Sequence, residues 1–158
     1  MNMAHFIRPL LCIFICLLVG GGSGFITVDS ISTWYVDIDK PFFNPPNWIF
    51  GPIWTTLYII MGVSAGLIWN TGAKDKAIKK ALLAFSIHLI LNGLWSILFF
   101  GLKNPELAFA EILLLLTSIM YYMALFYRIR PITAWMQVPY IAWVGFATLL
   151  NGSIAWLN

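Results

Sequence analysis

The stretch PNWIFGPIWTTLYIIMGVSAGLIW, Pro46–Trp69, contains no Asp, Glu, Lys or Arg. About 20 mostly apolar residues are enough for a helix to cross a bilayer, so this stretch predicts a membrane-spanning helix. Four more runs of this kind occur in the sequence. They cover residues 8–27, 77–102, 105–127 and 134–157.

The composition agrees with this prediction. The chain has 158 residues, of which 61% are hydrophobic and only 9% are charged, whereas soluble domains are about half apolar and a quarter charged. The two-residue alternation of a membrane barrel is absent. We therefore predict an all-α integral membrane protein, a five-transmembrane-helix bundle that forms a single domain over residues 1–158.

The first apolar run has a second interpretation. Arg8 precedes it and GGGSG follows it at 20–24, which is also the pattern of a cleaved signal peptide. We expect it to be kept, since cleavage would remove a whole helix from the bundle. Cys12 and Cys16 lie four residues apart in this run, which predicts neither a disulfide framework nor a metal site.

The basic residues predict the orientation of the chain. Seven of the nine Lys and Arg fall at one set of helix ends, which the positive-inside rule places in the cytoplasm together with the N-terminus. The loop at 28–45 then faces out, and it is long enough to form a lid. Charges at membrane boundaries indicate contact with lipid headgroups and not a nucleic-acid surface.

Three tryptophans lie too deep to be interface anchors. Trp34, Trp48, Trp69, Trp135 and Trp156 fall near predicted helix ends, where this residue is common. Trp54 and Trp95 lie roughly 12 and 10 Å below the outer ends of their helices at a 1.5 Å rise per residue, and Trp143 lies deeper. These positions predict an aromatic layer within the membrane.

Helical spacing places polar residues beside these rings. Residues at i, i+4, i+7 and i+11 share one face of a helix. Three such series occur: Trp54, Tyr58, Met61 and Ala65; His88, Asn92, Trp95 and Phe99; and, nearly so, Tyr140, Trp143, Ala147 and Asn151. Aromatic stripes with a few polar groups fit an apolar ligand pocket. They fit an ordinary bundle core equally well.

Few residues are candidates for chemistry. Glu111 and His88 are the ionisable residues that fall within predicted spans, and such residues are functional candidates. Either residue is also explained by a hydrogen bond between helices. No hydrolase, kinase, metalloprotease or phosphate-loop motif is present, so we predict no metal and no conventional catalytic residues.

Several motifs resemble those of a known family. They are WY at 34–35, KP at 40–41, NPP at 44–46, WIFGPIW at 48–54, NGLWSILFFGLKNP at 92–105 and WMQVPYIAWVGFATLLN at 135–151. This pattern resembles the tryptophan-rich sensory protein family, also called translocator protein or peripheral-type benzodiazepine receptor. The resemblance extends over nearly the whole chain.

The resemblance implies a five-helix membrane protein, commonly a homodimer, that binds porphyrins such as protoporphyrin IX, sterols and benzodiazepine-type ligands. It implies no required cofactor, because the porphyrin is the ligand. The pocket residues that it implies are Tyr35, Pro45, Trp54, Asn92, Trp95, Phe99, Trp143, Ala147 and Asn151. Tyr58, His88 and Tyr140 join this set, because each shares a helix face with residues in it.

One departure concerns sterols. Animal members carry a cholesterol-recognition segment with Tyr and Arg after the fifth helix, whereas residues 151–158 here contain neither. Leu125, Tyr127 and Arg130 fit only the loose cholesterol pattern. We therefore expect a bacterial cell-membrane protein with a tetrapyrrole-linked role.

Three functions follow as expectations. The first is a receptor or carrier in which Trp54 and Trp143 stack on a porphyrin and Lys40 or a loop amide meets a propionate. The second is light- and oxygen-dependent degradation of the porphyrin, with the same two indoles as electron donors. The third is a proton-coupled transporter that uses Glu111 or His88, although no internal repeat supports it.

Overall fold

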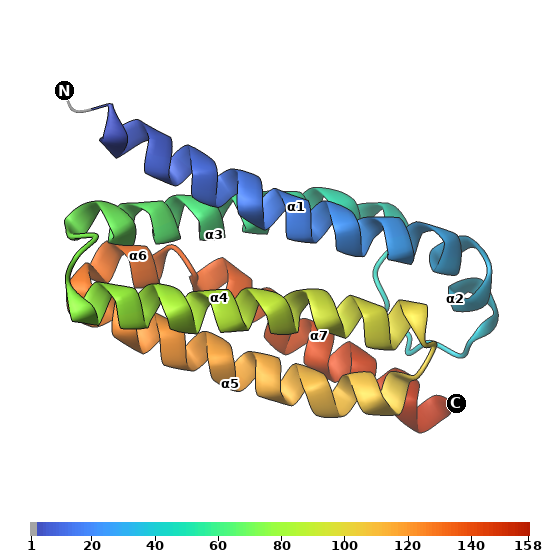
Figure 1. The fold of residues 1–158 in the computed structure, drawn as a ribbon. Helices are drawn as coiled ribbons and strands as arrows, with labels where there is room; N and C mark the ends of the chain where they lie inside the picture. The colour runs from blue at the N-terminus through green and yellow to red at the C-terminus, as the bar shows by residue number, and fades with distance from the viewer. Residues whose placement is uncertain (1–2) are drawn as a thin grey trace.

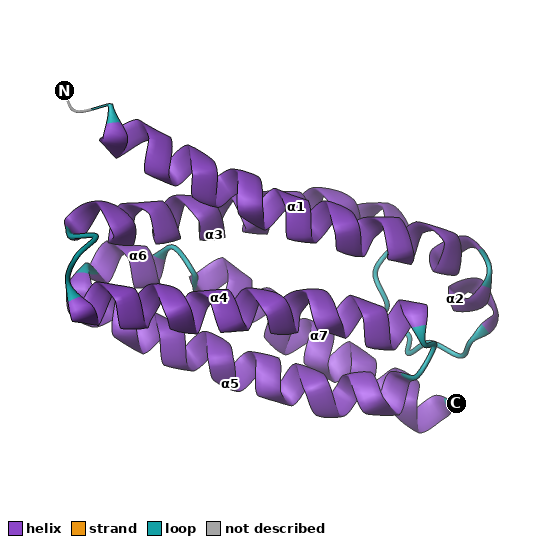
Figure 2. Cartoon of the chain, in the orientation of Figure 1, coloured by secondary structure: helices purple, strands orange, loops and turns teal. Residues whose placement is uncertain are grey.

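The computed structural model describes residues 3–158, and these residues form helices joined by short loops, without a strand (Figure 2). The helical elements are α1 (Ala4–Ser32), α2 (Trp34–Asp37), η1 (Asn47–Ile49), α3 (Phe50–Thr71), α4 (Lys76–Ser96), η2 (Ile97–Gly101), α5 (Pro105–Ile129), α6 (Pro131–Trp135) and α7 (Val138–Leu157). Within the described chain, five stretches are long and apolar enough to cross a membrane: His5–Ser32, Asn47–Thr71, Lys76–Gly101, Pro105–Ile129 and Pro131–Leu157. The predicted all-α membrane fold is confirmed.

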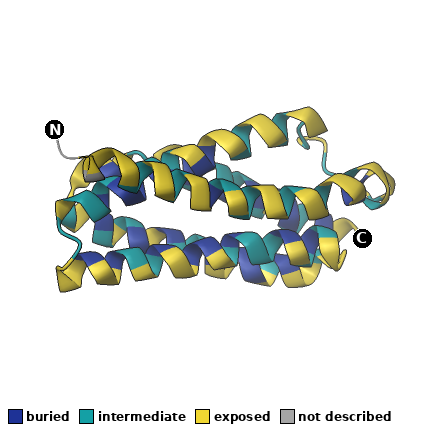
Figure 3. Cartoon of the chain, turned by 45° about the horizontal axis from the view of Figure 1, so that its top comes forward, coloured by how far each residue is buried: buried dark blue, intermediate teal, exposed yellow. Residues whose placement is uncertain are grey.

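The long helices form one bundle (Figure 1). α4 packs against α5, α5 packs against α7, and α1 lies along α3. The start of α1 and the α3–α4 turn lie at one end of the bundle, and α2 and the C-terminus lie at the other. Buried and exposed residues alternate along the long helices, so that each has a covered face and an exposed face (Figure 3). Many of the exposed residues are large and apolar, as in a helix that faces lipid.

Two glycines allow α1 and α3 to approach closely. A Cβ added to Gly62 would lie 2.9 Å from the carbonyl carbon of Cys12, and one added to Gly66 would lie 2.6 Å from the backbone nitrogen of Pro9. No side chain fits in that space. The GxxxG spacing of α3 therefore serves helix packing within this chain.

The predicted loop at 28–45 is partly wrong. α1 continues to Ser32, and α2 follows at Trp34–Asp37, so irregular structure begins only at Ile38. The Thr33 hydroxyl donates to the carbonyl of Asp29 at 2.7 Å, which keeps the end of α1 wound. Prolines at 41, 45 and 46 then disfavour helix in the residues before them, so the segment 38–46 remains irregular.

Two other helices differ in detail from the prediction. The C-terminal end of α4 continues as the π-helix η2, a local change of winding that sequence spacing does not reveal. The predicted helix 134–157 begins earlier, at Pro131, and is interrupted at Met136–Gln137. Pro131 and Pro139 each occupy the first turn of a helix, where proline is well tolerated.

Candidate functional site

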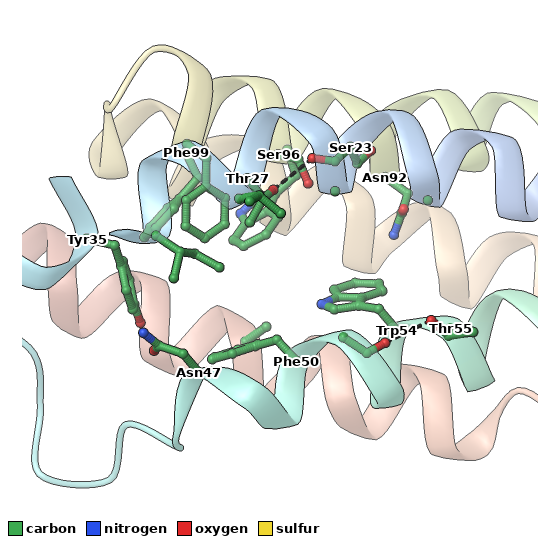
Figure 4. Close-up of a pocket in the computed structure, with 18 of the residues that line it drawn as sticks. Ser23, Thr27, Tyr35, Asn47, Phe50, Trp54, Thr55, Asn92, Ser96 and Phe99 are labelled. Atoms are coloured by element: carbon green, nitrogen blue, oxygen red, sulfur yellow. Dashed lines mark hydrogen bonds between the residues drawn. The ribbon is translucent and has the colours of Figure 1, made fainter. Parts of the chain in front are cut away.

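A cavity of about 530 Å³ lies between α1, α3, α4 and α7, toward the end of the bundle that carries α2 (Figure 4). This volume is in the range of small-molecule sites. The structure brings nine of the predicted site residues together around it: Tyr35, Trp54, Tyr58, Asn92, Trp95, Phe99, Trp143, Ala147 and Asn151. Most of the lining is aromatic or aliphatic, with a few polar groups.

α4 contributes one wall of the cavity. Trp95 and Phe99 lie one turn apart, and their rings stack with centroids 5.2 Å apart. The indole nitrogen of Trp95 donates to the side-chain oxygen of Asn151 at 3.0 Å, and the Asn151 amide donates to the carbonyl of Pro105 at 2.8 Å. Asn151 therefore fixes the Trp95 ring and ties α7 to the start of α5.

α3 and α7 contribute rings to the other side. Trp54 lies 5.7 Å from Tyr58 between ring centroids, and Trp143 lies 6.0 Å from Phe50 in an edge-to-face arrangement. Figure 4 shows Phe50 and Trp54 on one side of the cavity, opposite Phe99. Two indoles from different helices thus line the same space.

The segment after α1 lies at one end of the cavity and contributes Tyr35 to its lining (Figure 4). Tyr35 is almost fully buried, and its hydroxyl donates to the side-chain oxygen of Asn44 at 2.7 Å. Burial raises the pKa of Tyr35 to about 12. We call residues 34–46 the lid and the Tyr35–Asn44 bond its latch.

Lys40 does not match its expected role. Its ammonium group donates to the carbonyls of Tyr35 at 2.7 Å, Val36 at 3.3 Å and Ile38 at 2.6 Å. An ammonium has three N–H donors, and here each has an acceptor. Lys40 therefore caps the end of α2, and the geometry does not offer its charge to a ligand carboxylate.

Three predicted site residues do not line the cavity. Pro45 lies in the lid, away from the cavity wall. His88 and Tyr140 are completely buried behind Asn92, where they hydrogen-bond to each other at 3.1 Å. They share a helix face with lining residues, but they lie deeper than the cavity extends.

Glu111 is buried and lies outside the cavity lining. Neither of its carboxylate oxygens has a hydrogen-bond partner among the described residues. The indole nitrogen of Trp143 is likewise buried and without an acceptor in this part of the chain. Trp143 lines the cavity with its ring, while this nitrogen is covered by neighbouring side chains.

α1 contributes a wall of the cavity that was not predicted from the sequence. Gly20, Ser23, Gly24 and Thr27 line the cavity, and their spacing of three, four and seven residues is that of one helix face. Ser23 and Thr27 lie across the cavity from Trp54 in Figure 4. The spacing was present in the sequence, but the glycine run was interpreted only as part of a signal-peptide pattern.

Comparison with known proteins agrees with this architecture. Residues 12–157 match the TspO/MBR family. The chain is 37% identical to the tryptophan-rich protein TspO of Archaeoglobus fulgidus, over 100% of this chain and 99% of that protein. It is 34% identical to the human translocator protein, over 82% of this chain and 77% of that protein. It is 32% identical to the tryptophan-rich sensory protein of Cereibacter sphaeroides, over 79% of this chain and 77% of that protein. The chain belongs to the TspO/MBR family of integral membrane proteins.

Proposed function

We propose that this protein is a membrane receptor or carrier for a planar, amphipathic tetrapyrrole such as protoporphyrin IX. The observation that carries the proposal is the cavity, which lies within the membrane-spanning bundle and is lined by Trp54, Trp95 and Trp143 from three helices. Indole rings bury large planar surfaces and hold a polar N–H beside them. A flat, aromatic ligand of mixed polarity suits such a lining.

The polar groups around the cavity support the same ligand class. Asn92 lies at its inner part, and the lid with Tyr35 lies at its outer end (Figure 4). A ligand with an apolar ring system and peripheral oxygens would meet indoles along its faces and amide donors at its edge. The names of the related proteins, translocator and sensory protein, fit a carrier or receptor role.

Direct titration tests the proposal. The detergent-solubilised protein is titrated with protoporphyrin IX, haem and cholesterol while tryptophan fluorescence is followed. We expect saturable quenching by protoporphyrin IX at one site per chain. Absence of saturable binding, or binding of cholesterol alone, would contradict the proposed ligand class.

A double variant localises the binding. Replacing Trp54 and Trp143 with Phe removes two indoles from the cavity, and we expect the affinity for protoporphyrin IX to fall by about tenfold. The matched control replaces Trp135 and Trp156 with Phe, since these residues are exposed and lie outside the cavity. The control is expected to bind like the unaltered protein. An unchanged affinity in the first variant would contradict the assigned site.

The same cavity supports a second candidate activity. Trp54 and Trp143 line it together, so a bound photosensitiser would lie beside two oxidisable indoles. Molecular oxygen would be the oxidant in a light-dependent degradation of the porphyrin. Illumination of the complex with and without oxygen tests this activity. A single defined tetrapyrrole product that requires Trp54 and Trp143 would support it, and unspecific bleaching would exclude it.

A further inference from the structure

A continuous chain of hydrogen bonds runs from the cavity into the bundle. The side-chain nitrogen of Asn92 lies 3.0 Å from the Tyr140 hydroxyl, which lies 3.1 Å from Nε2 of His88. Nδ1 of His88 lies 3.1 Å from the Ser118 hydroxyl, which in turn lies 2.6 Å from the carbonyl of Leu115. The chain connects α4, α5 and α7, and only Asn92 among these residues lines the cavity.

The carbonyl of Leu115, at the end of this series of hydrogen bonds, determines which group donates and which accepts at each step. A backbone carbonyl only accepts, so the Ser118 proton points to Leu115 and the Ser118 oxygen accepts from Nδ1–H of His88. A neutral imidazole then has an acceptor at Nε2, to which Tyr140 donates its proton. The Tyr140 oxygen is left to accept from the Asn92 side-chain nitrogen. Each donor thus has one acceptor, and only one amide orientation satisfies all of them.

The other side of the Asn92 amide is also occupied. The Tyr58 hydroxyl donates to the Asn92 side-chain oxygen. An amide nitrogen carries two N–H donors, and Tyr140 takes one of them. Asn92 lines the cavity, and its second N–H is the donor that these bonds leave over, while its oxygen is already engaged.

We propose that Tyr140, His88 and Ser118 are positioning residues that hold Asn92 as a hydrogen-bond donor toward the cavity, and so select ligands with an acceptor oxygen at that depth. This inference rests on the proposed function and names the ligand chemistry at one point of the same site. Ligands with carbonyl or carboxylate oxygens are favoured over alkyl analogues of the same shape.

A pair of porphyrins isolates this effect. Mesoporphyrin IX dimethyl ester carries two neutral carbonyl acceptors where etioporphyrin carries only alkyl groups, and the two rings are otherwise alike. For the unaltered protein we expect the ester to bind about tenfold more tightly, the effect of one satisfied hydrogen bond in a buried site. The measured quantity is the ratio of the two dissociation constants.

Variants of Ser118 give the sharpest test, because this residue does not line the cavity. Ser118→Ala removes the acceptor for Nδ1–H of His88. The donor and acceptor roles of His88, Tyr140 and Asn92 are then no longer fixed. We expect the affinity ratio to fall to about threefold or less. Ser118→Thr keeps the hydroxyl and should keep the ratio of the unaltered protein. Tyr140→Phe should lower the ratio to the same extent as Ser118→Ala.

Tyr122→Phe is the matched control. Tyr122 is as buried as Tyr140, but its hydroxyl donates to Gln137 at 3.0 Å and takes no part in the chain. We expect Tyr122→Phe to lower the stability of the protein and to leave the ratio of the two dissociation constants unchanged. If Ser118→Ala and Tyr140→Phe bind both porphyrins with the original ratio, the positioning role is wrong. If the unaltered protein binds neither porphyrin, the proposed function itself fails, and this inference fails with it.

Discussion

Gly24 lies in the middle of α1 and borders the cavity, and a Cβ added there would meet no atom within 4 Å. Glycine in a helix interior is destabilising by roughly 0.5–1 kcal/mol relative to alanine. Packing within the chain does not require it at this position. The missing side chain instead leaves room in the cavity, where a ligand can lie against the backbone of α1.

Gly24→Leu tests this role. The leucine should fill part of the cavity and lower porphyrin affinity by about tenfold or more, the effect of overfilling a packed site. Gly22→Leu is its control, because Gly22 also has open space around it but does not line the cavity. Both variants should keep or increase thermal stability. If both variants lost affinity equally, the loss would come from a general disturbance of α1 and not from filling of the cavity.

The latch between Tyr35 and Asn44 gives a second prediction for single residues. Tyr35→Phe removes the 2.7 Å hydrogen bond, so we expect amide hydrogen exchange across residues 38–46 to increase by about tenfold. Tyr121→Phe serves as the control, since that side chain is exposed on α5. An unchanged exchange rate in Tyr35→Phe would show that the latch does not hold the lid.

The pH dependence of the latch follows from the raised pKa of Tyr35, about 12. The ordinary value for tyrosine is about 10, so the opened lid loses the proton first as the pH rises. The contribution of the latch is therefore complete below about pH 10 and is lost as the pH rises toward 12. The tyrosinate absorbance that is missing in Tyr35→Phe should titrate near pH 12. Titration near pH 10 would mean that the hydroxyl is exposed to solvent.

At the scale of elements, the contact between α1 and α3 supports one wall of the cavity. Gly66→Val would place a side chain against the backbone of Pro9 and separate the two helices. We expect a loss of stability on the order of 2–3 kcal/mol and a loss of porphyrin binding. Gly145→Val is the matched control on α7, where a Cβ meets no atom within 4 Å. Thermal unfolding in detergent should show this loss of stability in Gly66→Val and not in Gly145→Val. Equal stability of the two variants would contradict the prediction.

The elements also show what the sequence was able to predict. Five apolar runs predicted the spans, and depth together with helical spacing made Trp54, Asn92 and Trp95 candidates for one pocket. Spacing gives the face of a helix but not where a cavity ends, so His88 and Tyr140 were placed in the site although they lie behind it. The glycine run of α1 was not predicted as a wall, because it was considered only as the flank of a signal-peptide pattern and not for the helix face that it shares with Ser23 and Thr27.

At the scale of the whole molecule, the distribution of Lys and Arg predicts a cytoplasmic N-terminus. The lid and the α3–α4 turn lie at opposite ends of the bundle (Figure 1). With Cys12 and Cys16 replaced by Ala, we expect an impermeant maleimide to label Phe42→Cys but not Ala73→Cys in intact spheroplasts. Both should react after the membrane is disrupted. The reverse labelling pattern would show that the protein has the opposite orientation in the membrane.

A structure of the protein with bound protoporphyrin IX is the most direct test of the central claim. We expect the macrocycle in the cavity between α1 and α3, with Trp54 and Trp143 at its faces or edges and an acceptor oxygen within hydrogen-bond distance of the Asn92 amide nitrogen. A porphyrin bound on the lipid-facing surface, with the cavity lined as before and without ligand, would contradict the account.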